Sequence, residues 1–113
     1  MTPLKEEIFV CIDCESTGLE PKTDRIVEIA IAKFTFDQIL QQFESLINPE
    51  CEIPKISQDI HKISAEMVEG KPKIKEVLPH VLQMTGKHTI VGHGIYFDMS
   101  LIAAEAERSN VPT

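Results

Sequence analysis

Short runs of apolar residues dominate the first half of this chain. An unbroken run at positions 8–12, Ile-Phe-Val-Cys-Ile, is rich in strand formers and predicts a central strand that is covered on both faces. Two longer stretches, 25–36 and 39–47, have the same character and are separated only by Asp37-Gln38, which predicts an antiparallel hairpin. These three stretches together predict a three-stranded antiparallel meander.

The second half of the chain changes to helical spacing. Prolines make 48–57 an expected connection, and the serine and glycine that bound 64–70 predict a short helix. Apolar residues then recur at helical spacing across 73–85. A short apolar strand at 89–92 and a helix at 97–109 follow. This order of strands and helices is typical of an α/β or α+β sheet protein.

The composition is that of one ordinary globular domain. The chain has 113 residues, of which 42% are apolar and 26% are charged, so a second full domain is excluded. No apolar stretch approaches the ~18 residues needed to span a bilayer, and no signal segment opens the chain. Cys11 and Cys14 have CxxC spacing, but on an extended strand they face opposite sides, so neither a disulfide framework nor a zinc site is indicated. We therefore expect a cytoplasmic protein with no membrane association.

The net charge of −7 limits the ways in which this chain can bind nucleic acid. Neutralising the phosphates of a duplex requires clustered Lys and Arg, so this charge balance argues against non-specific DNA wrapping. Divalent cations bound to carboxylates can nevertheless reverse the local sign and attract phosphate. Metal-mediated contact with one strand end is the form of nucleic-acid binding that such a chain favours.

Acidic residues supply the candidate chemistry. Asp13 and Glu15 follow the first apolar run at a spacing that puts both side chains on one face of a strand, where they can chelate a hard cation. An isolated pair of this kind is a weak signal, because acids end many strands as solvated caps. A third acid, Asp98, strengthens it. Glu28 lies inside an apolar strand, and we expect a paired acid at the sheet margin there rather than a further ligand.

Four segments together resemble a known family. Asp13-Cys-Glu-Ser-Thr-Gly18 matches the motif D-x-E-[TS]-T-G, Arg25-Ile-Val-Glu-Ile-Ala resembles the usual second strand, and Ile60-His-Lys-Ile63 resembles an I-H-G-I segment. Gly92-His-Gly-Ile-Tyr-Phe-Asp98 resembles the second motif, A-H-N-A-x-F-D, with a glycine in place of the asparagine. The chain thus resembles the DEDDh 3′ to 5′ exonucleases, in particular the group with the proofreading epsilon subunit of bacterial DNA polymerase III.

The resemblance implies a fold and indicates how much of the family's domain this sequence covers. It implies an α/β, ribonuclease H-like mixed sheet in which a three-strand antiparallel meander is joined by a strand parallel to the first, with helices. Family members carry a third motif beyond the second one, a histidine followed five residues later by an aspartate, and no such pair follows Asp98 in the printed sequence. Residues 1–113 are therefore expected to be the N-terminal two-thirds of one exonuclease domain, without its last strand and helices, and inactive alone.

The resemblance also implies ligands for two divalent cations, Mg²⁺ or Mn²⁺, that drive phosphodiester hydrolysis. Asp13 would bridge both ions, Glu15 would bind the nucleophile-side ion and Asp98 would hold the second. The residues implied in binding the 3′-terminal nucleotide are Ser16, Thr17 and Gly18 through their backbone, Leu19 and Phe97 as apolar contacts to the base, and His61 as a weaker candidate.

The expected activity is removal of nucleotides from 3′ ends of single-stranded DNA in proofreading, beside a DNA polymerase subunit. Trimming of RNA 3′ ends, as in relatives of ribonuclease T or oligoribonuclease, is the alternative within the same chemistry. A non-catalytic binding module is the alternative of another class. An exposed strand edge at 89–92 also predicts pairing with a second copy of the chain.

Overall fold

A four-stranded mixed sheet organises the computed structural model, which describes residues 6–112. Its strands lie in the order β3-β2-β1-β4. Strand β1 pairs antiparallel with β2 and parallel with β4, and β2 pairs antiparallel with β3. The predicted meander with one added parallel strand is therefore confirmed. The strands are β1 (Phe9–Ser16), β2 (Ile26–Phe34), β3 (Ile39–Leu46) and β4 (Thr89–Val91).

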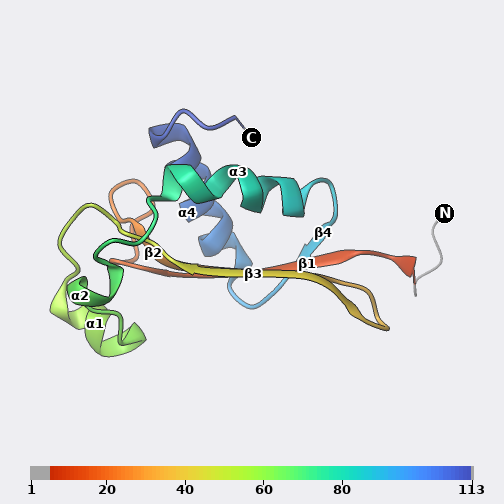
Figure 1. Ribbon diagram of the computed structural model, residues 1–113, viewed down its shortest axis with the longest axis horizontal. Coiled ribbons are helices and arrows are strands. Elements are labelled where there is room, and N and C mark those ends of the chain that lie inside the picture. The colour runs from red at the N-terminus through yellow and green to blue at the C-terminus, as the bar shows by residue number, and fades with distance from the viewer. Residues whose placement is uncertain (1–5, 113) are drawn as a thin grey trace.

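Helices cover one face of this sheet. Figure 1 shows α3 (Ile74–Thr85) and α4 (Ile95–Arg108) on the same side of the strands, while α1 (Lys55–His61) and α2 (Ala65–Val68) lie at one end of the sheet. None of the helices within residues 6–112 is long and apolar enough to cross a bilayer. We call the side of the sheet away from α3 and α4 its open face.

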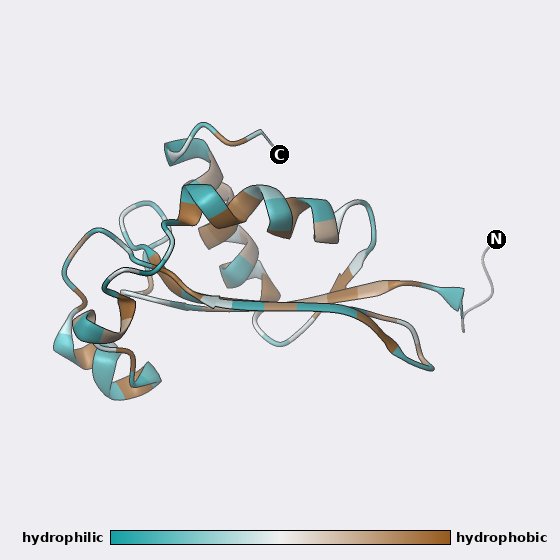
Figure 2. Ribbon diagram, viewed as in Figure 1, coloured by the Kyte–Doolittle hydropathy of each residue, from teal (hydrophilic) through white to brown (hydrophobic). Residues whose placement is uncertain are grey.

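The main core lies between the sheet and these two helices. The hydropathy colouring in Figure 2 shows the apolar side of α3 turned toward the strands. Residues of β1 alternate between this core and the open face, as the two-residue period of a strand requires. The fully or almost fully buried core side chains include Val10, Ile12, Ile29, Leu78, Val81 and Leu101.

Helix α1 was not predicted, because 48–57 was expected to be only a connection. Pro54 serves as its N-cap residue, and Lys62 ends it in the left-handed conformation. The helix has seven residues and buries only Ser57, while Ile56 and Ile60 point outward. It therefore lacks the buried apolar stripe from which a helix is usually predicted in a sequence.

The other predicted elements are present with shifted ends. Strand β1 continues through both acids of the first motif rather than ending before them. Helix α2 is capped by Ser64, as predicted, and α4 begins two residues earlier than expected. Strand β4 lies at the edge of the described sheet. Self-association through that edge stays a prediction.

Candidate functional site

The two acids of β1 lie together on the open face of the sheet. Val10, Ile12 and Cys14 alternate with them and are buried beneath the helices. Asp13 is exposed and Glu15 is half-buried. The structure therefore places these two carboxylates on one face, as the strand period predicts.

Asp98 reaches the same strand from the first turn of α4. Its side chain is only 5% exposed, and its Oδ1 accepts a hydrogen bond of 3.2 Å from the backbone N–H of Cys14. Pairing between β1 and β4 stops at Cys11 and Val91, so that N–H has no partner in β4. The third predicted acid thus meets the backbone of β1 between the other two acids.

The electrostatics of this region disfavour negative charge. Burial raises the pKa of Asp98, the hydrogen bond from Cys14 opposes the rise, and the neighbouring carboxylates of Asp13 and Glu15 add to it. Burial, followed by the charge of Asp98, also raises the pKa of the Cys14 thiol well above its usual range. Cys14 is therefore an inert core thiol, whereas a nearby cation would stabilise the ionised form of Asp98.

A divalent cation fits the donor chemistry of these acids. Asp13, Glu15 and Asp98 offer only carboxylate oxygens, the ligands that Mg²⁺ and Mn²⁺ prefer. Within residues 6–112, however, no three side chains of the types His, Cys, Asp and Glu are arranged to hold one ion together. The described acids therefore supply suitable oxygens but not a three-ligand set.

Glu28 adds a further carboxylate to this side of the sheet. It lies opposite Glu15 in the register of β1 and β2 and forms no ion pair among the described residues. Burial raises its pKa, and the charges of Glu44, Glu15 and Asp13 raise it further. The expectation of a paired acid at this position is therefore wrong, because the charged residues near it on β1 and β3 are acids rather than bases.

A cavity of about 420 Å³ joins the end of β1 to helix α1. It gathers all of the residues that the family resemblance implies in nucleotide binding, and it includes Glu15. It also includes four residues of the α1 region that the sequence analysis missed: Pro54, Ile56, Ser57 and Ile60. We call this cavity the β1–α1 pocket. Its predicted members are Ser16, Thr17, Gly18, Leu19, His61 and Phe97.

Most polar side chains around the β1–α1 pocket are occupied by hydrogen bonds to its own loop. Ser57 Oγ donates to the carbonyl of Thr17 at 2.6 Å, and Ser16 Oγ donates to the carbonyl of Gly18 at 2.6 Å. His61 Nδ1 accepts from the Ile63 N–H, so its Nε2 carries the proton and donates to the carbonyl of Ser16 at 3.1 Å. Among the side chains, what remains for a ligand is an apolar wall and the carboxylate of Glu15.

Two side chains on the rim of the pocket are markedly exposed for apolar residues. Leu19 is 87% exposed and Ile60 is 76% exposed. A second cavity, of about 630 Å³, begins on the other side of Asp13 and is lined by His93 and by open-face residues of β2 and β3. Asp13 and Glu15 thus stand between two hollows at the end of β1.

Sequence comparisons identify relatives of known type. A family model described as Exonuclease matches residues 10–112. The PolC-type DNA polymerase III of Thermotoga petrophila is 42% identical over 90 residues, which cover 80% of this chain and 7% of the polymerase. The 3′-5′ exonuclease DinG of Bacillus subtilis is 33% identical over 107 residues, which cover 94% of this chain and 12% of DinG. The chain spans only a small part of both relatives.

Comparison with solved structures gives the same architecture. Exonuclease X in complex with 5′ overhanging duplex DNA superposes with a TM-score of 0.70 at 32% identity, covering 82% of this chain and 52% of its own. Product-bound exonuclease I superposes with a TM-score of 0.81 at 16% identity, covering 91% of this chain and 26% of its own. These matches confirm the predicted ribonuclease H-like sheet.

Proposed function

Since the chain belongs to the exonuclease family, as its motifs predict, we propose that it takes part in the removal of nucleotides from 3′ ends of single-stranded DNA. The observation that carries this proposal is the β1–α1 pocket. It combines Glu15, which lies two residues after Asp13, with an apolar wall of a size that suits a nucleobase.

The wall of the pocket favours an unpaired terminal base. Leu19 and Ile60 expose apolar surface at its rim, and Phe97 adds an aromatic ring. Stacking of a base on an aromatic side chain contributes about 1 to 3 kcal/mol in single-strand binders. A frayed 3′ end can make this contact, whereas a base in a duplex must first be unpaired.

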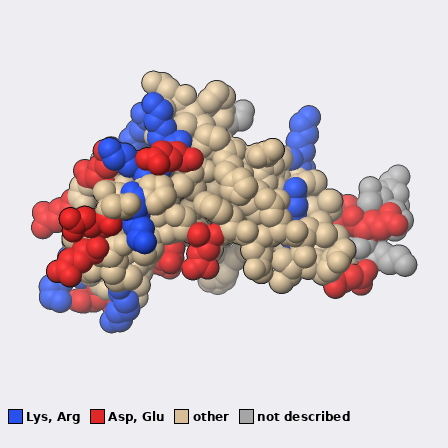
Figure 3. Space-filling view, viewed as in Figure 1, with Lys and Arg blue, Asp and Glu red and all other residues tan. Residues whose placement is uncertain are grey.

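The acidic residues have distinct proposed roles. Asp13, Glu15 and Asp98 would be ligands for divalent cations, Mg²⁺ or Mn²⁺, with Asp13 shared between two ions. Bound ions of this kind activate a water molecule and stabilise the leaving oxygen of a phosphodiester. Figure 3 shows acidic and basic side chains mixed at the end of the molecule that carries α1 and α2, with no broad basic patch on the face in view. Cations would therefore have to provide much of the attraction for phosphate.

The setting of the reaction is also a proposal. We propose that residues 1–113 are the N-terminal two-thirds of one exonuclease domain that works in the cytoplasm. The matched PolC-type relative is a DNA polymerase, which supports a polymerase partner and a proofreading role of the epsilon type. Exonuclease X was solved with DNA, which supports a DNA substrate.

Two alternatives remain. Trimming of RNA 3′ ends would use the same pocket. The side chains of Ser16, Ser57 and His61 already bind backbone carbonyls, so none of them distinguishes a ribose 2′-hydroxyl from a deoxyribose. A non-catalytic binding module would hold a 3′ end without cleaving it. These alternatives differ in product and in sugar preference, so one assay separates them.

The assay uses a single-stranded oligonucleotide that carries a 5′ fluorophore, in deoxy and ribo forms, with Mg²⁺ or Mn²⁺ present. Binding is followed by fluorescence anisotropy and cleavage by gel electrophoresis. For residues 1–113 alone, which are expected to be inactive, the proposal expects binding that a 3′-recessed duplex competes for poorly. A ladder of products shortened from the 3′ end is expected once the same residues are joined to a segment that carries the third motif. Binding without a ladder from that longer protein favours the binding module, and a ladder from the ribo form alone favours RNA trimming.

Matched variants assign the result to the pocket. Ile60→Ala removes exposed apolar surface from the pocket rim, whereas Met67→Ala removes exposed apolar surface from α2, outside the residues that line the pocket. We expect the first change to weaken binding about fivefold and the second to leave it unchanged. Equal effects of both changes, or no binding by the unaltered chain, would contradict the proposed site.

A further inference from the structure

The loop between β1 and β2 forms one wall of the β1–α1 pocket and is closed by a short ladder of polar contacts. The N–H of Thr17 donates to the carbonyl of Arg25 at 2.9 Å, and the Arg25 N–H donates to Thr17 Oγ1 at 3.0 Å. Thr17 Oγ1 also donates to Asp24 Oδ1 at 3.0 Å. These bonds fix the two ends of the loop, and within it the N–H groups of Thr23 and Asp24 donate to the carbonyl of Glu20, while the carbonyls of Pro21, Lys22 and Asp24 are bound by neither set.

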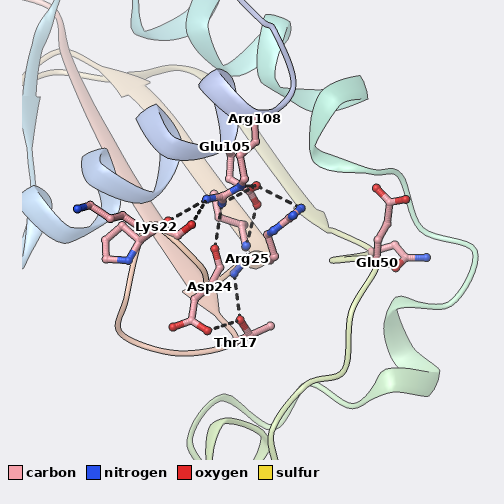
Figure 4. A network of polar contacts seen from close by, with 10 residues as sticks. Thr17, Lys22, Asp24, Arg25, Glu50, Glu105 and Arg108 are labelled. Atoms are coloured by element: carbon pink, nitrogen blue, oxygen red, sulfur yellow. Dashed lines mark hydrogen bonds and ion pairs between the residues drawn. The ribbon is translucent and has the colours of Figure 1, made fainter.

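Arg108, in the last turn of α4, binds these three carbonyls. Its Nη1 donates to the carbonyls of Pro21 and Lys22, both at 3.0 Å, and its Nη2 donates to the carbonyl of Asp24 at 3.0 Å. Its two remaining N–H groups donate to Glu105 Oε1 at 2.8 and 3.3 Å. All five donors of the guanidinium are therefore used, three of them on backbone carbonyls of the loop (Figure 4).

Glu105 fixes the guanidinium in this orientation. Its side chain is 1% exposed, and its Oε2 accepts a hydrogen bond of 3.0 Å from the N–H of Ile26 at the start of β2. Arg25 approaches Glu105 Oε1 only to 3.9 Å, so Arg108 is the closer basic partner. The carboxylate thus ties α4 to β2, and Arg108 ties the same helix to the loop.

Two parts of the pocket lining are consequently attached to one helix. Phe97, near the start of α4, lines the pocket directly, and Arg108, near its end, holds the loop that contributes Leu19 to the lining. Asp98 lies beside Phe97 and contacts β1. A helix is stiff over this length, so α4 fixes the loop relative to both the acids and the aromatic wall.

We propose that Arg108 is a positioning residue for the β1–α1 pocket: through its three carbonyl contacts it holds the Pro21–Asp24 segment so that Leu19 meets the terminal base. This inference rests on the proposed function, because it assumes that the pocket receives a 3′-terminal nucleotide. Arg108 itself does not line the pocket. It acts on the ligand only through the loop.

The test replaces Arg108 by lysine in the full 113-residue chain. Lysine keeps the charge and the contact with Glu105, but its compact ammonium cannot reproduce a planar fork of five donors. Arg25→Lys is the matched control, because it makes the same chemical change at the other arginine beside Glu105. The probe is a single-stranded oligothymidylate with 2-aminopurine as its 3′-terminal base, whose fluorescence changes when that base packs against protein side chains.

We expect R108K to bind the probe about tenfold more weakly and with a smaller fluorescence change, while R25K behaves as the unaltered chain. Amide hydrogen exchange should become faster at residues 19–24 of R108K and stay the same in β1 and β2. A role confined to overall stability would leave the fluorescence signature of the bound base unchanged.

The outcomes separate this inference from the proposed function. If the unaltered chain gives no fluorescence response, the nucleotide pocket itself is wrong and the inference falls with it. If the unaltered chain responds and R108K responds equally, only the positioning role is overturned. Unfolding of R108K below the assay temperature would also overturn it, because Arg108 would then support the whole fold rather than the loop.

Discussion

Asp98 accepts a hydrogen bond from the backbone of Cys14, the residue that separates Asp13 from Glu15. A side chain of α4 therefore fixes β1 at the point where the two acids of the first motif emerge. The contact spans 84 positions of sequence and couples the two motifs directly. It also holds a carboxylate in a buried place, next to two others, where burial and repulsion raise its pKa.

Replacing Asp98 should separate the hydrogen bond from the charge. Asp98→Asn keeps an oxygen that can accept from Cys14 but cannot ionise, whereas Asp98→Ala leaves the N–H without a partner. We expect D98N to be more stable than D98A by about 1 to 3 kcal/mol, the usual cost of an unpaired buried donor. Urea unfolding of both variants measures the difference. Equal stability would mean that water replaces the carboxylate.

Glu28 should make the stability of the protein depend on pH. Its pKa is raised in the folded chain, first by burial and then by Glu44, Glu15 and Asp13. The folded state therefore holds this proton more tightly than the unfolded state, and stability is lost as pH rises through the folded pKa. We expect Glu28→Gln to stabilise the protein at neutral pH, with the gain disappearing below the ordinary glutamate pKa of about 4.3.

A matched substitution on the helical layer controls for general charge effects. Glu107→Gln removes one carboxylate from an exposed position on α4 and leaves the open face of the sheet unchanged. Denaturant unfolding of both variants and the unaltered chain, at neutral and at acidic pH, gives the comparison. A gain for E28Q that persists in acid would refute the titration argument.

Gly18 and Asp24 should be energetically coupled. A β-carbon at Gly18 would overlap the Asp24 carboxylate, which is held by Thr17 Oγ1 at 3.0 Å and by the Glu20 N–H at 2.9 Å. Gly18→Ala should therefore cost about 1 to 3 kcal/mol in the unaltered chain and little in an Asp24→Ala background. Thermal unfolding of the double-mutant cycle measures this coupling. Simple additivity would show that the loop yields elsewhere.

The apolar runs were sufficient to predict the strands, although burial follows the two-residue period only in β1 and β2 and no residue of β3 is buried. The prediction that the 8–12 run is covered on both faces is wrong for the described residues, because α3 and α4 cover only the face of Val10, Ile12 and Cys14, whereas Asp13 and Glu15 lie on the open face. Helix α1 escaped prediction for a physical reason. It places Ile56 and Ile60 outward at the pocket, so its apolar residues serve the cavity rather than the core.

The polar framework of the site could not be predicted from local sequence. Glu105 and Arg108 lie on an ordinary amphipathic helix, and nothing near them in the chain indicates that Glu105 binds the start of β2, 79 positions earlier, or that Arg108 binds a loop 84 to 87 positions earlier. The motif residues gave the location of the pocket, since Ser16 to Leu19 all line it. The contacts that hold this loop depend on the packing of α4 and could be found only in three dimensions.

Divalent cations should bind this chain weakly and through the three predicted acids. Asp13, Glu15 and Asp98 offer suitable oxygens, but the described residues contain no three-ligand set, so binding must bring at least one carboxylate closer to the others. We therefore expect at most one Mn²⁺ ion, with a dissociation constant of about 1 mM. The raised pKa of Asp98 adds competition by protons, so the affinity for Mn²⁺ should fall as the solution becomes more acidic.

Mn²⁺ binding is measured by the loss of the free Mn²⁺ signal in electron paramagnetic resonance. We expect D98N to abolish the binding and E107Q to leave the binding intact. Two tight sites would contradict this prediction, because they would require the acids of β1 and α4 to move into a coordination shell that the described structure does not contain.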